Sequence, residues 1–256
     1  MEHYATAQQV YAAGMVFARV AAMLMVMPGL GEAAIPARVR TGMALVIAIC
    51  VFPIAGPHLP PMPEDTGGLE FLLVREILVG LLIGAVLRLM MSALAVAGEV
   101  VSLQTTLSFA QTANPMEAQP TGSVSTFLSV LGLALIFATN LHHVFLGAIF
   151  GSYTIPAFQP GHDLMLGDAV GLAVQTCGKA FTLGIQMAAP VIVFGLVFNI
   201  ASGLIGRLMP QFQIYFVASP LSVIFGLSIF ALSLGTIGML WIQRYRELTS
   251  SFTGGA

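Results

Sequence analysis

Four charged residues lie in or beside the third apolar run of this chain, residues 71–97: Arg75, Glu76, Arg88 and Glu99. Charges inside membrane-spanning segments are rare, costly to bury and usually functional. Arg75 and Glu76 are adjacent, so on a helix they point about 100° apart and do not face each other. Arg88 and Glu99 share a helix face but are roughly 16 Å apart along its axis. We expect their partners on other helices, on other subunits or in water, which favours a subunit of an assembly. The alternative is that Arg75 and Glu76 mark a helix start at the membrane interface.

Other side chains could in principle bind a metal or perform catalysis. His142 and His143 are adjacent, so their side chains should diverge on a helix, and no H-E-x-x-H motif or zinc-spaced cysteine pair is present. Ser152 follows Gly151, but nothing around it forms a nucleophile elbow. We expect ordinary hydrogen bonds at these positions, no metal, no cofactor and no enzymatic activity.

The composition is that of an integral membrane protein. Of the 256 residues, 57% are hydrophobic and only 8% are charged, against about 25% in an ordinary soluble domain. The formal net charge of −2 predicts no nucleic-acid partner and no polybasic lipid-binding patch.

A polar segment, residues 104–125, lies between two strongly apolar runs. It contains Asn114, Pro115, Pro120 and Gly122, and it has no Lys or Arg. Irregular chain at membrane depth is stable only inside protein or along a wet cavity, because lipid cannot satisfy free backbone groups. The segment therefore indicates a pore or a binding cleft, unless it is a solvent-exposed connector on one membrane face.

Six apolar runs predict the helices that position these residues: 10–27, 43–54, 71–97, 127–149, 181–208 and 212–242. The first and fourth have the roughly 20 residues that a spanning helix needs. The second is too short and ends at Pro53, whereas the third continues toward Leu107 and could reach roughly 50 Å. Pro190 and Pro220 should kink the last two. These lengths predict helical hairpins of uneven height.

Small residues and basic residues add two further expectations. The glycine pairs 80/84, 147/151 and 167/171 have the spacing that lets helices approach closely.

Arg38 and Arg40 assign the first loop to the cytoplasm, and Arg207 assigns the fifth loop to the same side. Arg244 and Arg246 place the C-terminus there as well, which six simple crossings do not allow. Either one run is a hairpin that does not cross, or the protein is not placed conventionally in the bilayer, and we favour the second interpretation.

Four local patterns occur together in this chain. They are MPGLGEAAIPARVR (27–40), REILVGLLIGAVLR (75–88), GEVVSLQTTLSFAQTANP (98–115) and RLMPQFQIYFVASPLS (207–222). In order and spacing they resemble the FliR/SctT family of type III secretion export-gate proteins, over nearly the whole chain. The chain departs from that family at Asn199, Ser219 and Ser222, where the family often has an acidic residue, a glycine, and a basic or amide residue.

The resemblance implies an all-α integral membrane protein that forms a single export-gate domain, residues 1–256. Residues 1–165 would be FliP-like helices and residues 166–256 a FliQ-like helical hairpin. The implied partners are FliP-like, FliQ-like, FlhB-like and FlhA-like gate components, membrane lipid, and unfolded flagellar subunits as cargo. The implied location is the bacterial inner membrane at the centre of the flagellar basal body, projecting toward the periplasm.

The resemblance also implies a role for the polar segment, as a plug in the closed gate. Phe109 and Met116 would block the lumen, Gln104 and Asn114 would offer hydrogen bonds, and Gly122 would end the plug. Ala110 and Pro115 belong to the same loop, Arg207 would lie at a subunit interface, and Pro210, Gln211 and Pro220 would form the turn of the C-terminal hairpin. The alternative function is a small-molecule secondary transporter, since carriers also have broken helices and intramembrane charges.

Overall fold

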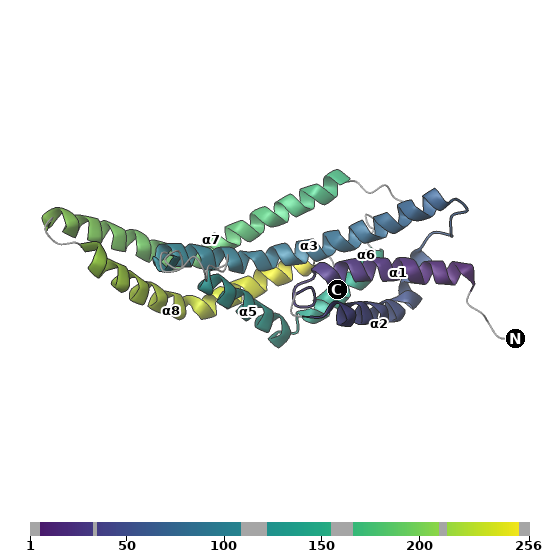
Figure 1. The fold of residues 1–256 in the computed structure, drawn as a ribbon, viewed down its shortest axis with the longest axis horizontal. Helices are drawn as coiled ribbons and strands as arrows, with labels where there is room; N and C mark the ends of the chain where they lie inside the picture. The colour runs from purple at the N-terminus through teal and green to yellow at the C-terminus, as the bar shows by residue number, and fades with distance from the viewer. Residues whose placement is uncertain (1–5, 33–34, 109–121, 155–165, 210–213, 251–256) are drawn as a thin grey trace. The chain divides into compact units, whose positions relative to one another are not determined.

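The structure is a computed structural model that describes residues 6–32, 35–108, 122–154, 166–209 and 214–250 (Figure 1). Every secondary-structure element in these ranges is a helix, which confirms the predicted all-α class. The helices are α1 (Ala7–Val26), α2 (Ala37–Ala55), the short 3₁₀ helix η1 (Gly56–His58), α3 (Thr66–Gln104), α5 (Ser123–Ala138), α6 (His142–Thr154), α7 (Leu166–Leu208) and α8 (Ile214–Ser250). Five of the described helices are long and apolar enough to cross a membrane, or six if α5 and α6 count as one broken span.

The described helices form two compact units that are interleaved in the sequence. One unit comprises residues 1–89, 137–177 and 245–256, and the other comprises residues 90–136 and 178–244. Because α3, α7 and α8 each contribute to both units, neither unit is a continuous stretch of chain. The division into FliP-like and FliQ-like parts near residue 165 stays a prediction.

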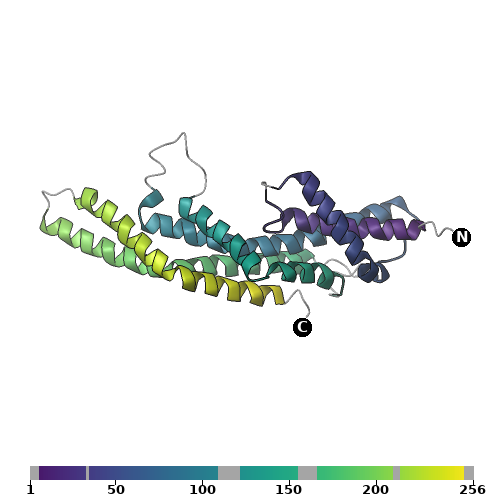
Figure 2. The same ribbon diagram turned by 90° about the horizontal axis from the view of Figure 1, so that it is seen from below.

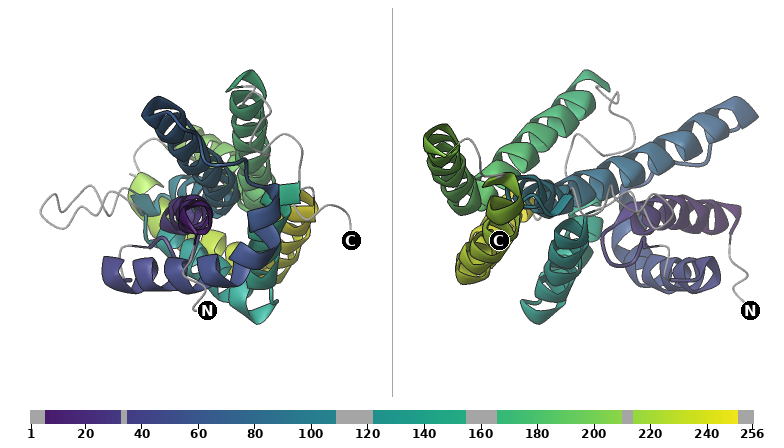
Figure 3. Two further views of the ribbon diagram at one scale, coloured as in Figure 1. Left: turned by 90° about the vertical axis from the view of Figure 1, so that its right-hand side faces the viewer. Right: turned by 60° about the vertical axis from the view of Figure 1, so that its left-hand side comes forward.

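In the first unit, α1 and α2 lie side by side (Figures 1 and 3). Helix α1 begins at a capping box, in which the Thr6 side chain accepts from the Gln9 backbone and the Gln9 side chain accepts from the Thr6 backbone. Its buried residues include Val16, Val20 and Leu24 at four-residue spacing, which forms the apolar stripe of a packed helix.

Helix α2 is longer than the sequence predicts. The apolar run 43–54 was expected to end at Pro53 and to be too short for a span; that expectation is wrong. The helix begins at Ala37 and passes through Pro53 to Ala55, and η1 extends it to a 22-residue candidate span. Polar residues form its first turns, where the Thr41 hydroxyl donates to the Ala37 and Arg38 carbonyls. A hydropathy criterion omits such residues although their backbone is helical.

The fourth apolar run, which has the length of a span, is not one straight helix. It divides into α5 and α6, which meet at a bend of 75° and form either a broken span or a re-entrant pair. Asn140 lies at the break with a φ of 57°, in the left-handed region that asparagine tolerates better than most residues. The polar pair Thr139-Asn140 inside an apolar run was the sequence signal for this break.

The remaining helices are very long. At 1.5 Å per residue, the 39 residues of α3, the 43 of α7 and the 37 of α8 extend about 58, 64 and 55 Å. Pro190 lies inside α7 and Pro220 inside α8, and both helices continue beyond their proline. Within the second unit, α7 and α8 form a hairpin (Figure 2).

Two of the predicted small residues permit close helix packing. Gly80 and Gly84 of α3 face α1, and a Cβ atom at Gly80 would collide with the Arg19 carbonyl oxygen. At Gly84 it would lie 2.8 Å from the Met23 carbonyl oxygen. Gly167 and Gly171 differ, because a Cβ at either would meet none of the described atoms within 4 Å.

Candidate functional site

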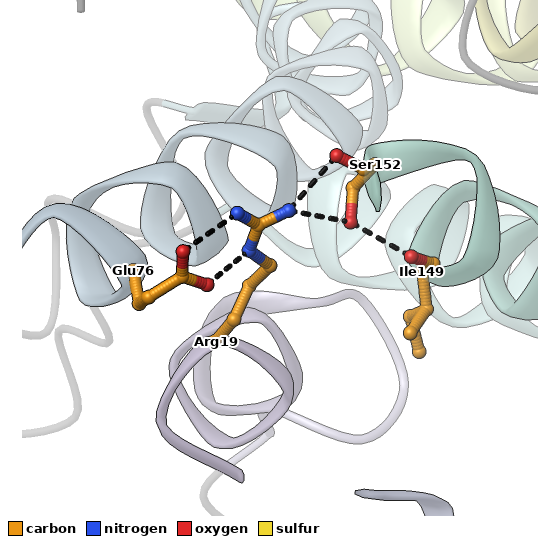
Figure 4. A network of polar contacts seen from close by, with 4 residues as sticks. All are labelled: Arg19, Glu76, Ile149 and Ser152. Carbon is orange, nitrogen blue, oxygen red and sulfur yellow. Dashed lines mark hydrogen bonds and ion pairs between the residues drawn. The ribbon is translucent and has the colours of Figure 1, made fainter. Parts of the chain in front are cut away.

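A buried ion pair joins α1 to α3 in the first unit. Arg19 and Glu76 are each 1% exposed. The Arg19 Nε–Glu76 Oε2 distance is 2.6 Å and the Nη2–Oε1 distance is 2.9 Å, so the guanidinium and the carboxylate form a bidentate pair (Figure 4). Bidentate geometry satisfies both groups at once, which is the condition for burying two charges in an apolar interior.

The same guanidinium also contacts α6. Its Nη1 donates to the Ser152 carbonyl oxygen at 2.8 Å and lies 3.3 Å from the Ser152 hydroxyl, which donates to the Ile149 carbonyl (Figure 4). The Tyr153 ring centroid is 4.2 Å from the guanidinium carbon, a cation–π arrangement. Ser152 is therefore part of a hydrogen-bond network that links α1, α3 and α6.

The structure places the predicted charges in different environments. Arg75 and Glu76 are the tenth and eleventh residues of α3 and are buried, so they do not mark a helix start. Arg88 is 50% exposed and lies 4.0 Å from Glu32, which makes a weak surface pair. Arg207 is exposed in the last turn of α7, where a positive charge favours the helix dipole.

Glu99 closes the base of the polar segment. Its Oε1 accepts a hydrogen bond of 2.9 Å from the backbone N–H of Gly122, just before α5. Gly98 packs directly on the backbone of Ser125, and the Ser125 hydroxyl donates to the Ala95 carbonyl. The end of α3 and the start of α5 are thus held together on either side of the predicted plug. Glu99 serves there as an acceptor for backbone rather than as half of an ion pair between described residues.

The end of α3 also packs closely against the α7–α8 hairpin. A Cβ at Gly195 of α7 would lie 2.7 Å from the Gln104 side chain, and a Cβ at Gly226 of α8 would collide with Thr105. Thr106 follows with a φ of 59°, a left-handed conformation that is strained for a β-branched residue. The end of α3 is therefore held in place by close contacts with α7 and α8. Phe109, Ala110, Asn114, Pro115 and Met116 lie outside the described residues, and their role as a plug stays a prediction.

A cavity of about 260 Å³ adjoins this point in the second unit. It is lined by hydrogen-bonding side chains (Thr106, Asn199, Ser202, Ser219 and Ser222) together with Phe198, Gly203 and Ala218. The Thr106 and Ser219 hydroxyls are 3.4 Å apart. The three positions at which the chain departs from the FliR/SctT pattern all lie on this wall. Pro220 is inside α8 rather than in the hairpin turn, and Pro210 and Gln211 lie outside the described ranges.

His142 and His143 begin α6, and their side chains do not diverge as predicted. Their ring centroids are 4.3 Å apart, because both follow the left-handed turn at Asn140 instead of lying in a helix interior. The part of the chain that the structure describes contains no group of three or more His, Cys, Asp or Glu side chains arranged to hold a metal.

The matches to known proteins extend over nearly the whole chain. Residues 10–248 match the family described as bacterial export proteins, family 1. A flagellar biosynthetic protein FliR from Caulobacter vibrioides is 56% identical over 253 residues, covering 99% of this chain and all of that protein. The chain belongs to the FliR family.

More distant FliR proteins also match most of this chain. The Escherichia coli protein is 28% identical over 216 residues, covering 83% of this chain and 80% of that protein. The Bacillus subtilis protein is 26% identical over 210 residues, with coverages of 82% and 80%. The resemblance drawn from the four sequence patterns is confirmed. FliR proteins form a flagellar export family and not a known enzyme family.

Arg19, which links α1 to α3 and α6, was not among the residues singled out from the sequence of this FliR-family chain. The available signal was a single arginine within the apolar run 10–27, matched by an acidic residue in the third run. Glu32, the partner of Arg88, was missed in the same way. Both pairings join residues that are 56 or 57 positions apart, so local spacing could not identify them.

Proposed function

We propose that this protein is a structural subunit of the flagellar type III export gate, which helps to form the channel for unfolded flagellar subunits and seals it with the loop after α3. The subunit would assemble with FliP-like and FliQ-like chains in the inner membrane at the centre of the basal body, projecting toward the periplasm. FlhA-like and FlhB-like components would adjoin it.

The observation that carries this proposal is the length of the apolar surface on α7. Large exposed apolar side chains occur from Val170 to Leu208, along a helix of about 64 Å. The hydrocarbon core of a bilayer is only about 30 Å thick. The stretch from Val170 to Leu208 is about 57 Å long, and a tilt of about 40° would still leave roughly 44 Å of it along the membrane normal. Lipid cannot cover all of this surface, so other protein chains are needed to cover the rest.

The fixed base of the polar segment supports the sealing role. Glu99, Gly122 and Ser125 hold its two ends together without using residues 109–121. A loop attached in this way can move without unfolding the helices that carry it. The α7–α8 hairpin likewise supports residues 166–256 as a FliQ-like part of the subunit, with residues 1–165 as the FliP-like part.

Deletion of residues 110–119 tests the seal. We expect the assembled gate to form and its ion conductance to rise, because the base of the loop remains while most of the loop, including the blocking side chain of Met116, is lost. A matched control replaces the same ten residues with Gly and Ser, which keeps the length of the loop but removes Asn114, Pro115 and Met116. Wild-type conductance in a correctly assembled deletion variant would exclude the sealing role.

A small-molecule carrier is the second candidate, because the bent pair α5–α6 resembles the broken helices of transporters. The two functions differ in behaviour during purification. A carrier is expected to be monodisperse alone or as a small homo-oligomer, whereas a gate subunit is expected to aggregate unless it is co-expressed with its partner chains.

A further inference from the structure

Helix α3 is followed by a residue whose backbone conformation is unfavourable for its type. Thr106 has a φ of 59°, in the left-handed region. A β-branched residue is an outlier there, because its side chain crowds the backbone. Among the described residues other than glycine, Asn140 alone shares this conformation, and asparagine tolerates it much better. The break at Thr106 therefore carries strain that the break at Asn140 does not.

The interruption of the helix is confined to this one position. The Thr105 N–H still donates to the Val101 carbonyl at 3.0 Å, as in a continuous α-helix, whereas the Thr106 N–H donates to the nearer Leu103 carbonyl. The backbone is helical again at residues 107–108. A change of backbone angles at Thr106 is therefore sufficient to join the two helical segments.

The chain before the break is a fixed base. A Cβ atom at Gly195 of α7 would lie 2.7 Å from the side-chain oxygen of Gln104, and a Cβ at Gly226 of α8 would collide with Thr105. The Thr105 hydroxyl also donates to the Val101 carbonyl at 2.9 Å. Strained backbone persists only where the surrounding structure enforces it, and these contacts hold the residues that lead into the strained one.

The contact of Thr106 itself is weaker. Its hydroxyl oxygen lies 3.4 Å from that of Ser219, which is long for a hydrogen bond between hydroxyls. The cavity of about 260 Å³ borders both residues, so the Thr106 side chain can turn without displacing packed atoms. A strained residue with a weak contact and free space beside it is suited to change conformation.

We propose that Thr106 is a single-residue hinge between two states of the end of α3. The structure shows the bent state. In the other state Thr106 takes helical backbone angles, α3 continues through residues 107–108, and the chain beyond them is redirected, while Gln104 and Thr105 stay in place. The inference rests on the proposed function, because the redirected chain would carry the sealing loop, and it adds the residue at which that loop turns.

A disulfide across the hinge tests this inference. The variant Thr106→Cys/Ser219→Cys is made in a Cys50→Ser/Cys177→Ser background, which removes both exposed native thiols. Oxidation should hold the hinge in the bent state of the assembled complex. We expect export of flagellar subunits to fall at least about tenfold on oxidation and to recover on reduction, because one of the two states is no longer accessible.

The matched control ties the fixed base. In Gln104→Cys/Gly195→Cys the two Cβ atoms would lie 3.5 Å apart, within the range of disulfides. Its oxidation should leave export unchanged, and mass spectrometry verifies both bonds. Equal losses in the two oxidised pairs, or no loss in either, would overturn the hinge. A bond that forms at 104–195 but not at 106–219 would contradict the bent state itself.

Two single substitutions test the hinge without a cross-link, and they decide the matter if neither disulfide forms. Thr106→Asn relieves the strain of the bent state, so the fraction of time that the assembled gate conducts ions should fall about fivefold. Thr106→Ala favours the continuous helix and removes the hydroxyl contact, so this fraction should rise. A purely structural role of Thr106 predicts changes of the same sign, and such a result would overturn the proposal.

The complex with wild-type Thr106 separates failure of this inference from failure of the proposed function. If that complex neither exports flagellar subunits nor conducts ions, the proposed function fails. If it does both, but the oxidised 106–219 pair and the two single substitutions change neither, only the hinge fails.

Discussion

At the scale of single residues, the pairing of Arg19 with Glu76 joins two helices of the first unit through buried charges. Both groups are buried, and the guanidinium also bonds to Ser152. The energetic weight of such a pair lies less in its net attraction than in the cost of losing one member, since the remaining charge stays buried without compensation.

Removing one charge of the pair should therefore be severe. We expect Glu76→Gln to destabilise the protein by about 3–5 kcal/mol, because Arg19 remains charged and buried. The double variant Arg19→Met/Glu76→Met should recover most of this loss, since it replaces both charges with apolar side chains. Thermal unfolding of the purified complex measures the difference.

The surface pair Arg88–Glu32 provides the control for this experiment. Both of its side chains are about half exposed, so Arg88→Met should cost less than about 1 kcal/mol. A Glu76→Gln variant no less stable than Arg88→Met would show that the buried pair does not hold α1 and α3 together.

At the scale of the helices, the contact between α1 and α3 requires glycine. Gly80→Ala should separate the two helices, because the added methyl group meets the Arg19 backbone carbonyl, which cannot move as a flexible side chain could. We expect a loss of about 1–3 kcal/mol, the usual cost of overpacking. Unfolding of the same complex by heat is the measurement.

Gly171→Ala in α7 is the matched substitution. A Cβ there meets no described atom within 4 Å, and alanine favours a helix over glycine by about 1 kcal/mol. This variant should be as stable as wild type or more stable. Equal destabilisation at both positions would show that the α1–α3 contact is not the cause, because helix propensity alone predicts a gain in stability from either substitution.

Hydrophobic patterns predicted the long helices but not their interruptions. The runs that became α3, α7 and α8 are long enough for apolar composition to identify them, and their true ends lie in polar residues that composition ignores. The break at Asn140 depends on one residue adopting a left-handed conformation, and the extension of α2 consists of a few polar residues that follow Pro36. Such features act over one or two residues, below the range of a hydropathy window.

The candidate site was predictable only in part, for a different reason. Glu76, Glu99 and Gly122 could be singled out because charge and glycine are unusual in their surroundings. Their partners come from distant parts of the chain, as does the wall of the cavity, where Thr106 meets residues of α7 and α8. One sequence contains no record of which distant residues meet.

At the scale of the whole molecule, the apolar faces are longer than a membrane can cover. Val174 and Leu204 are both exposed on α7 and lie about 45 Å apart along its axis. Both positions cannot contact the hydrocarbon core of one bilayer unless the helix is steeply tilted, so at least one is expected to contact another subunit.

Aspartate substitutions at these two positions test this expectation. We expect at least one of Val174→Asp and Leu204→Asp to enter the membrane normally yet lose co-purification with the other gate subunits, because a charge in a protein contact must be desolvated. Gln175→Asp, at an exposed polar neighbour, is the control and should assemble. If both variants assemble as wild type does, α7 is not covered by partner chains at either position.

The burial of Arg19 has a consequence for how the protein is made. Arg19 is synthesised long before Glu76, so α1 reaches the insertion machinery with an unpaired cation. An arginine at the centre of a lone inserted helix costs about 2.5–3.5 kcal/mol, and a lone glutamate in α3 faces a similar barrier. Delayed release of α1 until α3 emerges from the ribosome would remove both penalties together, so we expect these two segments to insert jointly although α2 is translated between them.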